Sequence, residues 1–291
     1  MRLRRPVAGL ASLTIALGLA ACGSDDSSSD SGSSESTGST SASTITVPEA
    51  IKGKGSLKIA ADASYAPNEF IEPGGKDIVG MDVDLGKAIG EKLGLKVEFE
   101  NATFDAIIPG LAAAKYDLGM SSFTDTKERE QTVDFVTYFS AGTSFFVKSD
   151  GGPAVASLED LCGKKVAVQK GTTQADDVQA QAKKCKLTAL VYPDQNAANL
   201  ALKSDRADVS LADSPVAAYQ VKQSAGAFKL SGEAYGTAPY GIAIPKDSGL
   251  ADPVLEAVKA LIADGSYTKI LEQWGVEAGA ITDPVINGAE S

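Results

Sequence analysis

Residues 166–191, VAVQKGTTQADDVQAQAKKCKLTALV, decide the fold class because they contain a strand, a helix and a second strand in close succession. Residues 166–168 form a short apolar strand, residues 171–184 a helix that opens with Gly-Thr-Thr, and residues 187–191 a second apolar strand. Strands that alternate with helices at this spacing predict a parallel sheet with helices on both of its faces.

The same alternation extends in both directions from this stretch. On its N-terminal side, hydrophobic spacing predicts three strands and two helices, at 57–60, 97–99 and 116–120 and at 85–93 and 104–111. On its C-terminal side, it predicts two strands and four helices, at 209–211 and 240–245 and at 197–204, 214–223, 251–263 and 267–274. The chain therefore contains two α/β cycles and a returning C-terminal segment.

Two cycles with a return predict an α/β protein of two lobes that are joined by two crossings. The extended segments 145–148 and 235–242, both flanked by glycine, are the candidates for these crossings. Ligands of such sheets bind beyond the carboxyl ends of the strands, so we expect a binding cleft between the lobes.

The chain is predicted to have five parts along its length. These are a signal peptide (1–21), a tether (22–45), a first lobe (46–146 with 242–280), a second lobe (147–241) and a C-terminal tail (281–291). The Ser-rich tether cannot bury enough apolar surface to offset its chain entropy, so we expect it to be disordered.

The predicted signal peptide ends in a pattern that resembles a bacterial lipobox. A basic start and an apolar run lead to Leu19-Ala20-Ala21-Cys22, in which the Cys22 thiol would be acylated after cleavage. The alternative is an ordinary signal peptide with an incidental cysteine. With the lipobox, the protein is expected outside the cytoplasm and attached to the membrane only through this lipid anchor.

Composition excludes several classes of function. The net charge of −11 and the lack of a basic patch argue against nucleic acid as a partner. The chain has no histidine, which removes Ser-His-Asp and Cys-His catalysis and every His-containing metal site. We expect no catalytic residue, no metal and no cofactor. Asp82 and Asp84 could be an acid/base pair, but we expect Asp82 to cap the helix that follows it.

Two cysteines remain once Cys22 is assigned to the lipid. Cys162 and Cys185 are an even pair in an oxidising compartment, which favours a disulfide between them. The alternative is two free, buried thiols.

Six motifs in order give the chain a close resemblance to a known family. They are the stretches 61–67 (ADASYAP), 80–85 (GMDVDL), 104–111 (FDAIIPGL), 121–129 (SSFTDTKER), 171–174 (GTTQ) and 213–216 (DSPV). The chain resembles the family 3 extracellular solute-binding proteins, the polar amino acid receptors of ABC importers, from about Ser56 to Val276. The resemblance implies the two-lobed periplasmic-binding-protein type II fold and a free amino acid as the ligand. It also implies an ABC permease as the partner, and we expect the protein to be a monomer.

The resemblance implies a ligand-binding role for ten residues. Arg129 would clamp the ligand carboxylate, to which a guanidinium offers two parallel donors. Ser121, Ser122 and Thr124 would line the same loop and add donors. Thr172 and Thr173, at the N-terminus of the helix after Gly171, would contribute donors and a favourable helix dipole from the second lobe.

The other implied contacts are acidic or aromatic. Asp213 would receive the ligand's α-ammonium group, although it could also cap the helix that begins at Ser214. Tyr65 and Phe104 would enclose the aliphatic part of the ligand side chain, and Asp62 would contact its polar end.

The identity of the ligand stays open at this point. The family usually has Pro-Phe-Glu after the Tyr65 loop, whereas this chain has Pro67-Asn68-Glu69-Phe70, which changes the specificity side of the pocket. Glutamine, glutamate, arginine, histidine and cystine are all candidates. Two other functions use the same fold and are kept as alternatives, a cyclohexadienyl dehydratase and a sensory ligand-binding module.

Overall fold

The structure is a computed structural model that describes residues 45–290. The predicted signal peptide, Cys22 and nearly all of the predicted tether lie outside these residues. No helix in the described range is long and apolar enough to cross a membrane.

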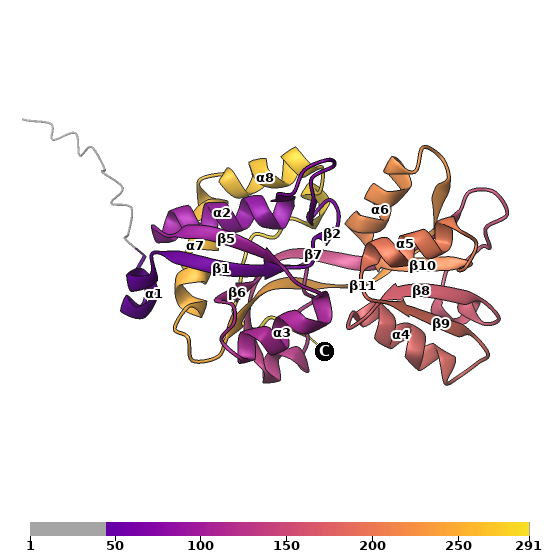
Figure 1. Ribbon diagram of the computed structural model, residues 1–291, viewed down its shortest axis with the longest axis horizontal. Helices are drawn as coiled ribbons and strands as arrows, with labels where there is room; N and C mark the ends of the chain where they lie inside the picture. Colours follow the sequence, from indigo (N-terminus) through magenta and orange to yellow (C-terminus); the bar gives the residue numbers. More distant parts are fainter. Residues whose placement is uncertain (1–44, 291) are drawn as a thin grey trace, which may run out of the picture. The chain divides into compact units, whose positions relative to one another are not determined.

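One eight-stranded sheet organises the fold, with the strand order β5-β1-β6-β11-β7-β10-β8-β9. Its strands are β1 (Ser56–Ala61), β5 (Lys96–Asn101), β6 (Leu118–Gly119), β7 (Val133–Lys148), β8 (Lys165–Gln169), β9 (Thr188–Tyr192), β10 (Val209–Asp213) and β11 (Phe228–Pro245). The β5-β1-β6 end belongs to the first lobe and the β10-β8-β9 end to the second lobe (Figure 1). The two long strands β7 and β11 run through both.

Helices cover both faces of the sheet in each lobe, as the strand–helix alternation predicts. The first lobe carries α1 (Glu49–Lys54), α2 (Met81–Leu93), α3 (Phe104–Ala112), α7 (Ala251–Ala263) and α8 (Ser266–Trp274). The second lobe carries α4 (Thr173–Ala182), α5 (Gln195–Lys203) and α6 (Ser214–Gln223). In Figure 1, α2 and α8 lie above the strands of the first lobe and α3 lies below them, whereas α6 and α4 take these places in the second lobe. The α/β two-lobed fold class is therefore confirmed.

The sheet is only partly parallel, which corrects the prediction of a parallel sheet. β1 pairs in parallel with β5 and β6, and β8 pairs in parallel with β9 and β10. The crossing strands β7 and β11 are antiparallel to each other and to their neighbours. The predicted crossings 145–148 and 235–242 are short pieces of these strands. Residues 133–144 have no strict alternation because most of them are buried, which hid the rest of β7.

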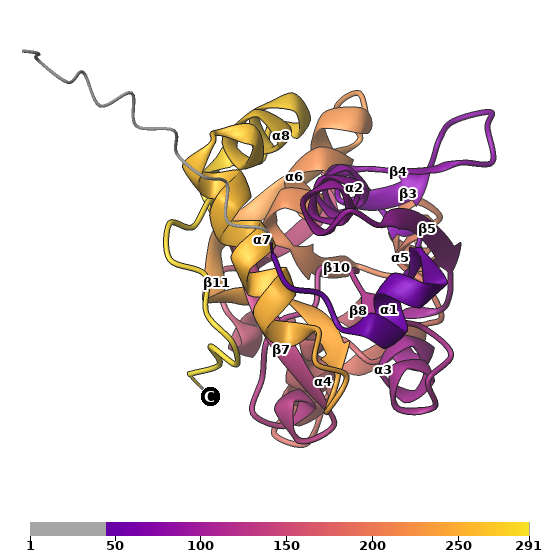
Figure 2. The ribbon, with the colours of Figure 1, turned by 90° about the vertical axis from the view of Figure 1, so that its left-hand side faces the viewer.

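A second, three-stranded sheet belongs to the first lobe. It consists of β2 (Ser64–Tyr65), β3 (Glu69–Ile71) and β4 (Ile78–Val79), and the loop between β3 and β4 projects from the molecule in Figure 2. This small sheet was not predicted, since its strands are only two or three residues long. It holds Tyr65 and Glu69 at the edge of the cleft.

The two lobes have separate apolar cores. The largest cluster, which includes Leu57, Leu85 and Val254, fills the first lobe between α2, α7 and the sheet. A second cluster, which includes Val166 and Val178, lies under α4 in the second lobe. The lobe boundaries at 146/147 and 241/242 fall inside β7 and β11, and they stay predictions.

The disulfide between Cys162 and Cys185 is confirmed. The two Sγ atoms are 2.05 Å apart and the Cα atoms 5.7 Å apart. The bridge joins the 3-10 helix η2 (Leu158–Leu161) to the end of α4, so it ties both flanks of β8 together.

The predicted C-terminal tail lies along β7. Thr137 donates its backbone N–H to the carbonyl of Val285 (2.9 Å), and Asn287 donates to the carbonyl of Phe135 (2.8 Å). This C-terminal segment, residues 281–290, therefore pairs with β7 at the edge of the sheet. It lies next to the loop that carries Arg129.

Candidate functional site

A pocket lies between the two lobes, and all ten residues predicted to bind the ligand line it. From the first lobe these are Asp62, Tyr65, Phe104, Ser121, Ser122, Thr124 and Arg129, and from the second lobe Thr172, Thr173 and Asp213. Glu69, Gln169 and Gln174 complete the wall. The structure therefore brings the predicted residues together, while the role of each stays a prediction.

Direct hydrogen bonds join the lobes across this pocket. The Tyr65 hydroxyl donates to Oδ2 of Asp213 at 2.9 Å, and the backbone N–H of Asp213 donates to the same hydroxyl oxygen at 2.9 Å. The side chain of Gln169 donates to Oδ2 of Asp62 at 2.9 Å. Bonds of this length need the two walls of the cleft to be in contact, so the structure is the closed form of the two lobes.

Arg129 begins the short 3-10 helix η1 (Arg129–Gln131) and points into the cleft. Its Nη1 donates to the carbonyl of Thr124 (2.7 Å) and its Nη2 to the carbonyl of Gly171 in the second lobe (2.9 Å). The guanidinium also lies over the rings of Phe104 and Phe123, at 5.4 and 5.6 Å from their centroids. Burial lowers the pKa of Arg129, and the carboxylate of Asp213 opposes that shift.

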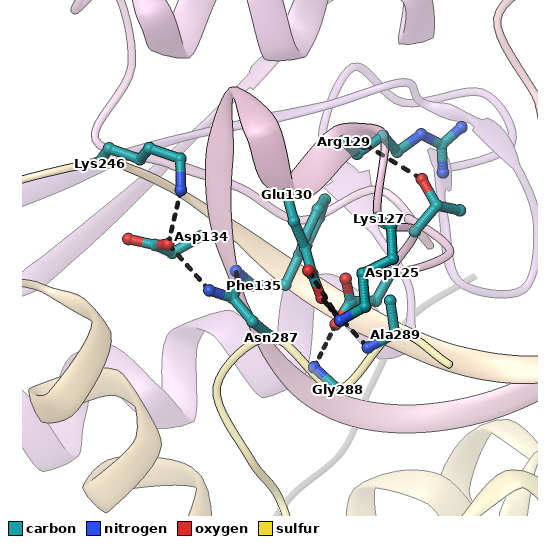
Figure 3. A network of polar contacts seen from close by, with 11 residues as sticks. Asp125, Lys127, Arg129, Glu130, Asp134, Phe135, Lys246, Asn287, Gly288 and Ala289 are labelled. Atoms are coloured by element: carbon teal, nitrogen blue, oxygen red, sulfur yellow. Dashed lines mark hydrogen bonds and ion pairs between the residues drawn. The ribbon is translucent and has the colours of Figure 1, made fainter. Parts of the chain in front are cut away.

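The loop that carries Arg129 is fixed from behind by the C-terminal segment (Figure 3). Gly288 donates its N–H to Oδ2 of Asp125 at 2.7 Å, and Ala289 donates to Oε1 of Glu130 at 3.2 Å. Lys127 bonds Glu130 within the same loop, at 3.0 Å. A guanidinium on a loop held at both ends needs little ordering when it meets a carboxylate.

Asp213 ends β10 on the opposite wall and is nearly buried. It occupies the N-cap position of α6, but its side chain makes no capping hydrogen bond. Its Oδ1 instead accepts a bond from the side chain of Gln174 (2.7 Å) and its Oδ2 the bond from Tyr65. Burial raises the pKa of Asp213, and these hydrogen bonds oppose the shift. The carboxylate therefore lines the pocket and does not serve as a cap.

The N-terminus of α4 faces the pocket from the second lobe. Thr172 caps this helix, since its hydroxyl oxygen accepts a bond from the N–H of Ala175 at 3.2 Å. Gly171 precedes it with a φ of 77°, and a Cβ there would meet Asp105 of the first lobe at 3.0 Å. The free N–H groups and the dipole at this helix end favour a negative group, as the prediction for Thr172 and Thr173 requires.

The first-lobe wall of the pocket carries two carboxylates, those of Asp62 and Glu69. Asp62 accepts bonds from the hydroxyl of Ser64 (2.6 Å) and the N–H of Phe104 (2.9 Å), and burial raises its pKa. Glu69 is completely buried and accepts bonds from the hydroxyls of Ser121 (3.0 Å) and Ser122 (3.1 Å). The described pocket residues thus include three carboxylates and one cation, Arg129.

The prediction for Asp82 is wrong. The helix α2 begins at Met81, its N-cap is Gly80, and no side chain caps it. A Cβ on Gly80, whose φ is 137°, would overlap the carbonyl of Asn68, so only glycine fits at this helix start. Asp82 consequently lies in the first turn, points inward, and accepts bonds from the N–H of Ser122 (2.9 Å) and the hydroxyl of Tyr138.

Three pocket residues were missed by the sequence analysis. Glu69 is the first residue of the three-residue strand β3, and a strand this short shows no alternation that could mark its buried side. Gln169 ends β8 and Gln174 lies in the first turn of α4, so both flank the Gly-Thr-Thr motif. Polar side chains at the carboxyl end of a parallel strand and at the next helix start point to the same edge of the sheet.

Comparisons with known proteins agree with this arrangement. Residues 57–277 match the family described as bacterial extracellular solute-binding proteins, family 3. The arginine-binding protein ArgT of Corynebacterium glutamicum is 35% identical over 248 residues, which cover 83% of this chain and 81% of that protein.

Two solved structures described as ancestral arginine-binding proteins are similar over nearly the whole of their length. An ancestral arginine-binding protein bound to arginine matches with a TM-score of 0.73 and 40% identity, over 76% of this chain and 98% of that chain. The form bound to glutamine matches with a TM-score of 0.72 and 40% identity, over 77% and 99%.

Proposed function

Because the chain belongs to family 3 of the bacterial extracellular solute-binding proteins, we propose that it is the amino-acid-binding component of an ABC importer and that arginine is its preferred ligand. The protein captures one free amino acid between its lobes and delivers it to the membrane permease. It is a binding protein and not an enzyme, in keeping with the binding proteins to which it is similar.

The charge arrangement of the pocket supports an amino acid with a cationic side chain. Arg129 matches the α-carboxylate and Asp213 the α-ammonium group of a zwitterion, one on each wall of the cleft. Asp62 and Glu69 are two further carboxylates, in the wall that also carries Arg129. The α-ammonium group of the ligand is already assigned to Asp213, so an amino acid with a neutral side chain brings no cation to Asp62 and Glu69. A guanidinium at the end of the ligand side chain supplies one, since buried charges need partners.

The aromatic residues support a long, partly apolar side chain. Tyr65 and Phe104 both line the pocket, and the Phe104 ring stacks on Phe123 with a distance of 4.5 Å between the ring centroids. The methylene groups of arginine would pack between Tyr65 and Phe104. The similarity to ArgT and to the ancestral protein bound to arginine supports the same ligand.

Closure of the two lobes is the proposed means of capture. A ligand that contacts Arg129 and Asp213 at once binds the closed form better than an open one, so it shifts the population towards closure. The permease would then recognise the closed pair of lobes.

A lipid anchor at Cys22 is the proposed attachment to the cell surface. The order of basic residues, apolar run, small residues and Cys22 supports it, and the Ser-rich stretch supplies the tether. A Cys22→Ser variant is expected to appear in the soluble fraction outside the cytoplasm, whereas the native protein stays with the membrane.

Calorimetric titration tests the proposed ligand directly. The protein is unfolded and refolded to remove any bound amino acid and is then titrated with arginine, lysine, glutamine, histidine, glutamate and cystine. We expect one arginine per chain with the highest affinity and no binding of glutamate, whose side chain would face Asp62 and Glu69. Tight binding of glutamate, or of none of these ligands, would contradict the proposal.

A further inference from the structure

Glu69 occupies an unusual place for a charged residue. Its side chain is fully buried, yet it forms part of the pocket wall. Its two oxygens accept hydrogen bonds only from neutral hydroxyls, those of Ser121 at 3.0 Å and Ser122 at 3.1 Å. A carboxylate held in this way is solvated by dipoles but is not neutralised.

A second carboxylate, that of Asp82, is buried directly behind it. Asp82 accepts the backbone N–H of Ser122 at 2.9 Å, while the hydroxyl of the same serine donates to Glu69. Ser122 therefore contacts both carboxyl groups, with its backbone at a φ of 52°. Asp82 does not line the pocket, so it acts on a ligand only through its neighbours Glu69 and Ser122, which do.

The groups that face this pair carry no positive charge. They are Asp62 after β1, Tyr65 on β2 and Tyr138 on β7, whose hydroxyl bonds Asp82 at 2.7 and 2.8 Å. Among residues 45–290, neither Glu69 nor Asp82 takes part in an ion pair. Arg129 and Asp213 lie in the same pocket and are the groups assigned to the α-carboxylate and α-ammonium of the ligand.

Two neighbouring buried carboxylates without a cation repel each other, which favours the uptake of a proton by one of them. Burial raises the pKa of Glu69 well above its ordinary value, and the negative charge of Asp82 raises it further. Burial likewise raises the pKa of Asp82, to about 6. Such a pair loses its two protons in separate steps, so it carries one negative charge over a range of pH in which two isolated carboxylates would carry two.

We infer that Glu69, through a proton that it shares with Asp82, is the residue by which the pocket distinguishes a cationic side chain from a neutral one. This inference rests on the proposed function. When a guanidinium enters, the shared proton leaves to solvent, and the doubly ionised pair holds the cation. When a neutral carboxamide enters, the proton stays, and the carboxyl of Glu69 donates it in a hydrogen bond to the amide oxygen.

The inference makes the choice between arginine and glutamine depend on pH. Because arginine binding releases a proton, its affinity falls as pH decreases, by about tenfold per pH unit where one whole proton is released. Glutamine binding releases none, so its affinity stays level over the same range. The ratio of the two affinities therefore rises with pH.

Calorimetry in buffers of different ionisation enthalpy measures the released proton. Arginine and glutamine are titrated into the refolded native protein from about pH 5 to about pH 8, in at least two buffers at each pH. We expect a net release approaching one proton with arginine at the lower pH values and a release near zero with glutamine. Arginine binding without proton release at any pH would overturn the inference and leave the proposed function intact.

Asp82→Asn separates a shared proton from a merely structural role. This variant removes the like charge behind Glu69, so the released proton and the pH dependence of arginine affinity are both expected to decrease. A structural role would instead weaken both ligands equally at every pH. Asp84→Asn is the matched control, because Asp84 lies on the same helix but bonds Gln273 and Trp274 away from the pocket.

Glu69→Gln provides a second variant if Asp82→Asn does not fold. It removes the carboxyl of Glu69 from the pocket wall, so we expect weaker arginine binding, a smaller proton release and a weaker pH dependence of the ratio of the two affinities. An unchanged proton release in Glu69→Gln would overturn the inference. If neither ligand binds the native protein at any pH, the proposed function itself fails, and the inference fails with it.

Discussion

Arg129 is a single residue that three parts of the molecule hold in place. Its guanidinium bonds a carbonyl of its own loop and a carbonyl of the second lobe, and it lies over the two stacked rings of Phe104 and Phe123. A guanidinium has five N–H groups, and the bonds to Thr124 and Gly171 use two of them. The remaining N–H groups can donate to a ligand. A planar donor in a partly buried site is suited to a carboxylate.

Arg129→Ala is expected to abolish or severely weaken arginine binding. Loss of one partner of a buried charge pair costs about 2–5 kcal/mol of binding free energy, which corresponds to a rise in Kd of roughly thirtyfold or more. Thermal unfolding of the ligand-free variant should change little, because the desolvated cation contributes little net stability. Titration calorimetry and a thermal melt measure the two effects.

Arg206→Ala is the matched control for this variant. Arg206 is exposed and bonds only Ser204 in the second lobe, so its removal should leave the Kd for arginine unchanged. Equal losses of affinity in the two variants would contradict the assignment of Arg129 to the ligand carboxylate.

Family motifs located the pocket residues better than local patterns did. Ten residues from five separate motifs converge on one pocket, and Arg129 in particular has no local pattern that marks it for the cleft. The local pattern gave a wrong prediction for Asp82. An acidic residue near the start of a helix predicts a cap, and the sequence does not show whether its side chain bonds the helix end or turns towards the protein interior. Glu69 was missed since nothing in a two- or three-residue strand reveals which side faces a cleft.

The helix α4 and its disulfide form an element whose two ends have different functions. Its N-terminus faces the pocket with Thr172 and Thr173, whereas Cys185 follows its C-terminus and joins Cys162. A helix of ten residues is about 15 Å long, so the bridge is remote from the ligand. The bridge therefore stabilises the second lobe without shaping the pocket.

Replacement of both cysteines by serine is expected to lower stability but not affinity. A bridge across 23 residues contributes about 2–4 kcal/mol to the free energy of unfolding, mainly by constraining the unfolded chain. Denaturant unfolding measures this loss, and the Kd for arginine should stay within about twofold under native conditions. Cys22→Ser, which leaves the bridge intact, should unfold like the native protein; an equal loss there would contradict the role of the bridge.

The C-terminal segment is the element that fixes the Arg129 loop from behind. Truncation after Asp283 removes the N–H groups of Gly288 and Ala289 from Asp125 and Glu130. We expect arginine affinity to fall by about tenfold, since the loop must then be ordered on binding, which costs about 1 kcal/mol or more. Calorimetry on the truncated protein checks this.

Lys246→Ala tests whether any change near the C-terminal segment lowers the affinity for arginine. Lys246 pairs with Asp134 at 3.1 Å beside the C-terminal segment (Figure 3), and a partly exposed pair contributes only about 0–1 kcal/mol. The Kd of the Lys246→Ala variant for arginine should equal that of the native protein. A truncation that binds arginine as tightly as the native chain would show that the segment does not position the loop.

Elements within each α/β cycle were predictable, and elements that cross between cycles were not. The helix after strand 57–60 ends at Gly94, as predicted, because Gly94 adopts the left-handed conformation there at a φ of 68°. Antiparallel pairing of β7 with β11 depends on residues about 100 positions apart, such as Phe139 and Tyr240, and no local period encodes such pairing.

Residues 45–290 form two lobes connected by two strands, with Arg129 on one wall of the cleft and Asp213 on the other. Within the described residues, only β7 and β11 link the lobes covalently, so the contacts of Tyr65, Gln169 and Arg129 across the cleft decide how far it opens. These contacts are few and polar, and such interfaces allow relative motion of the parts. A ligand with groups for both walls adds to them and favours closure.

The radius of gyration in solution, with and without arginine, tests this account most directly. Small-angle X-ray scattering is measured on refolded, ligand-free protein and again at saturating arginine, with the Arg129→Ala variant beside it. We predict that arginine lowers the radius of gyration of the native protein, and that it leaves the variant unchanged. Native protein that binds arginine by calorimetry and yet keeps the same radius of gyration would contradict capture by closure of the lobes.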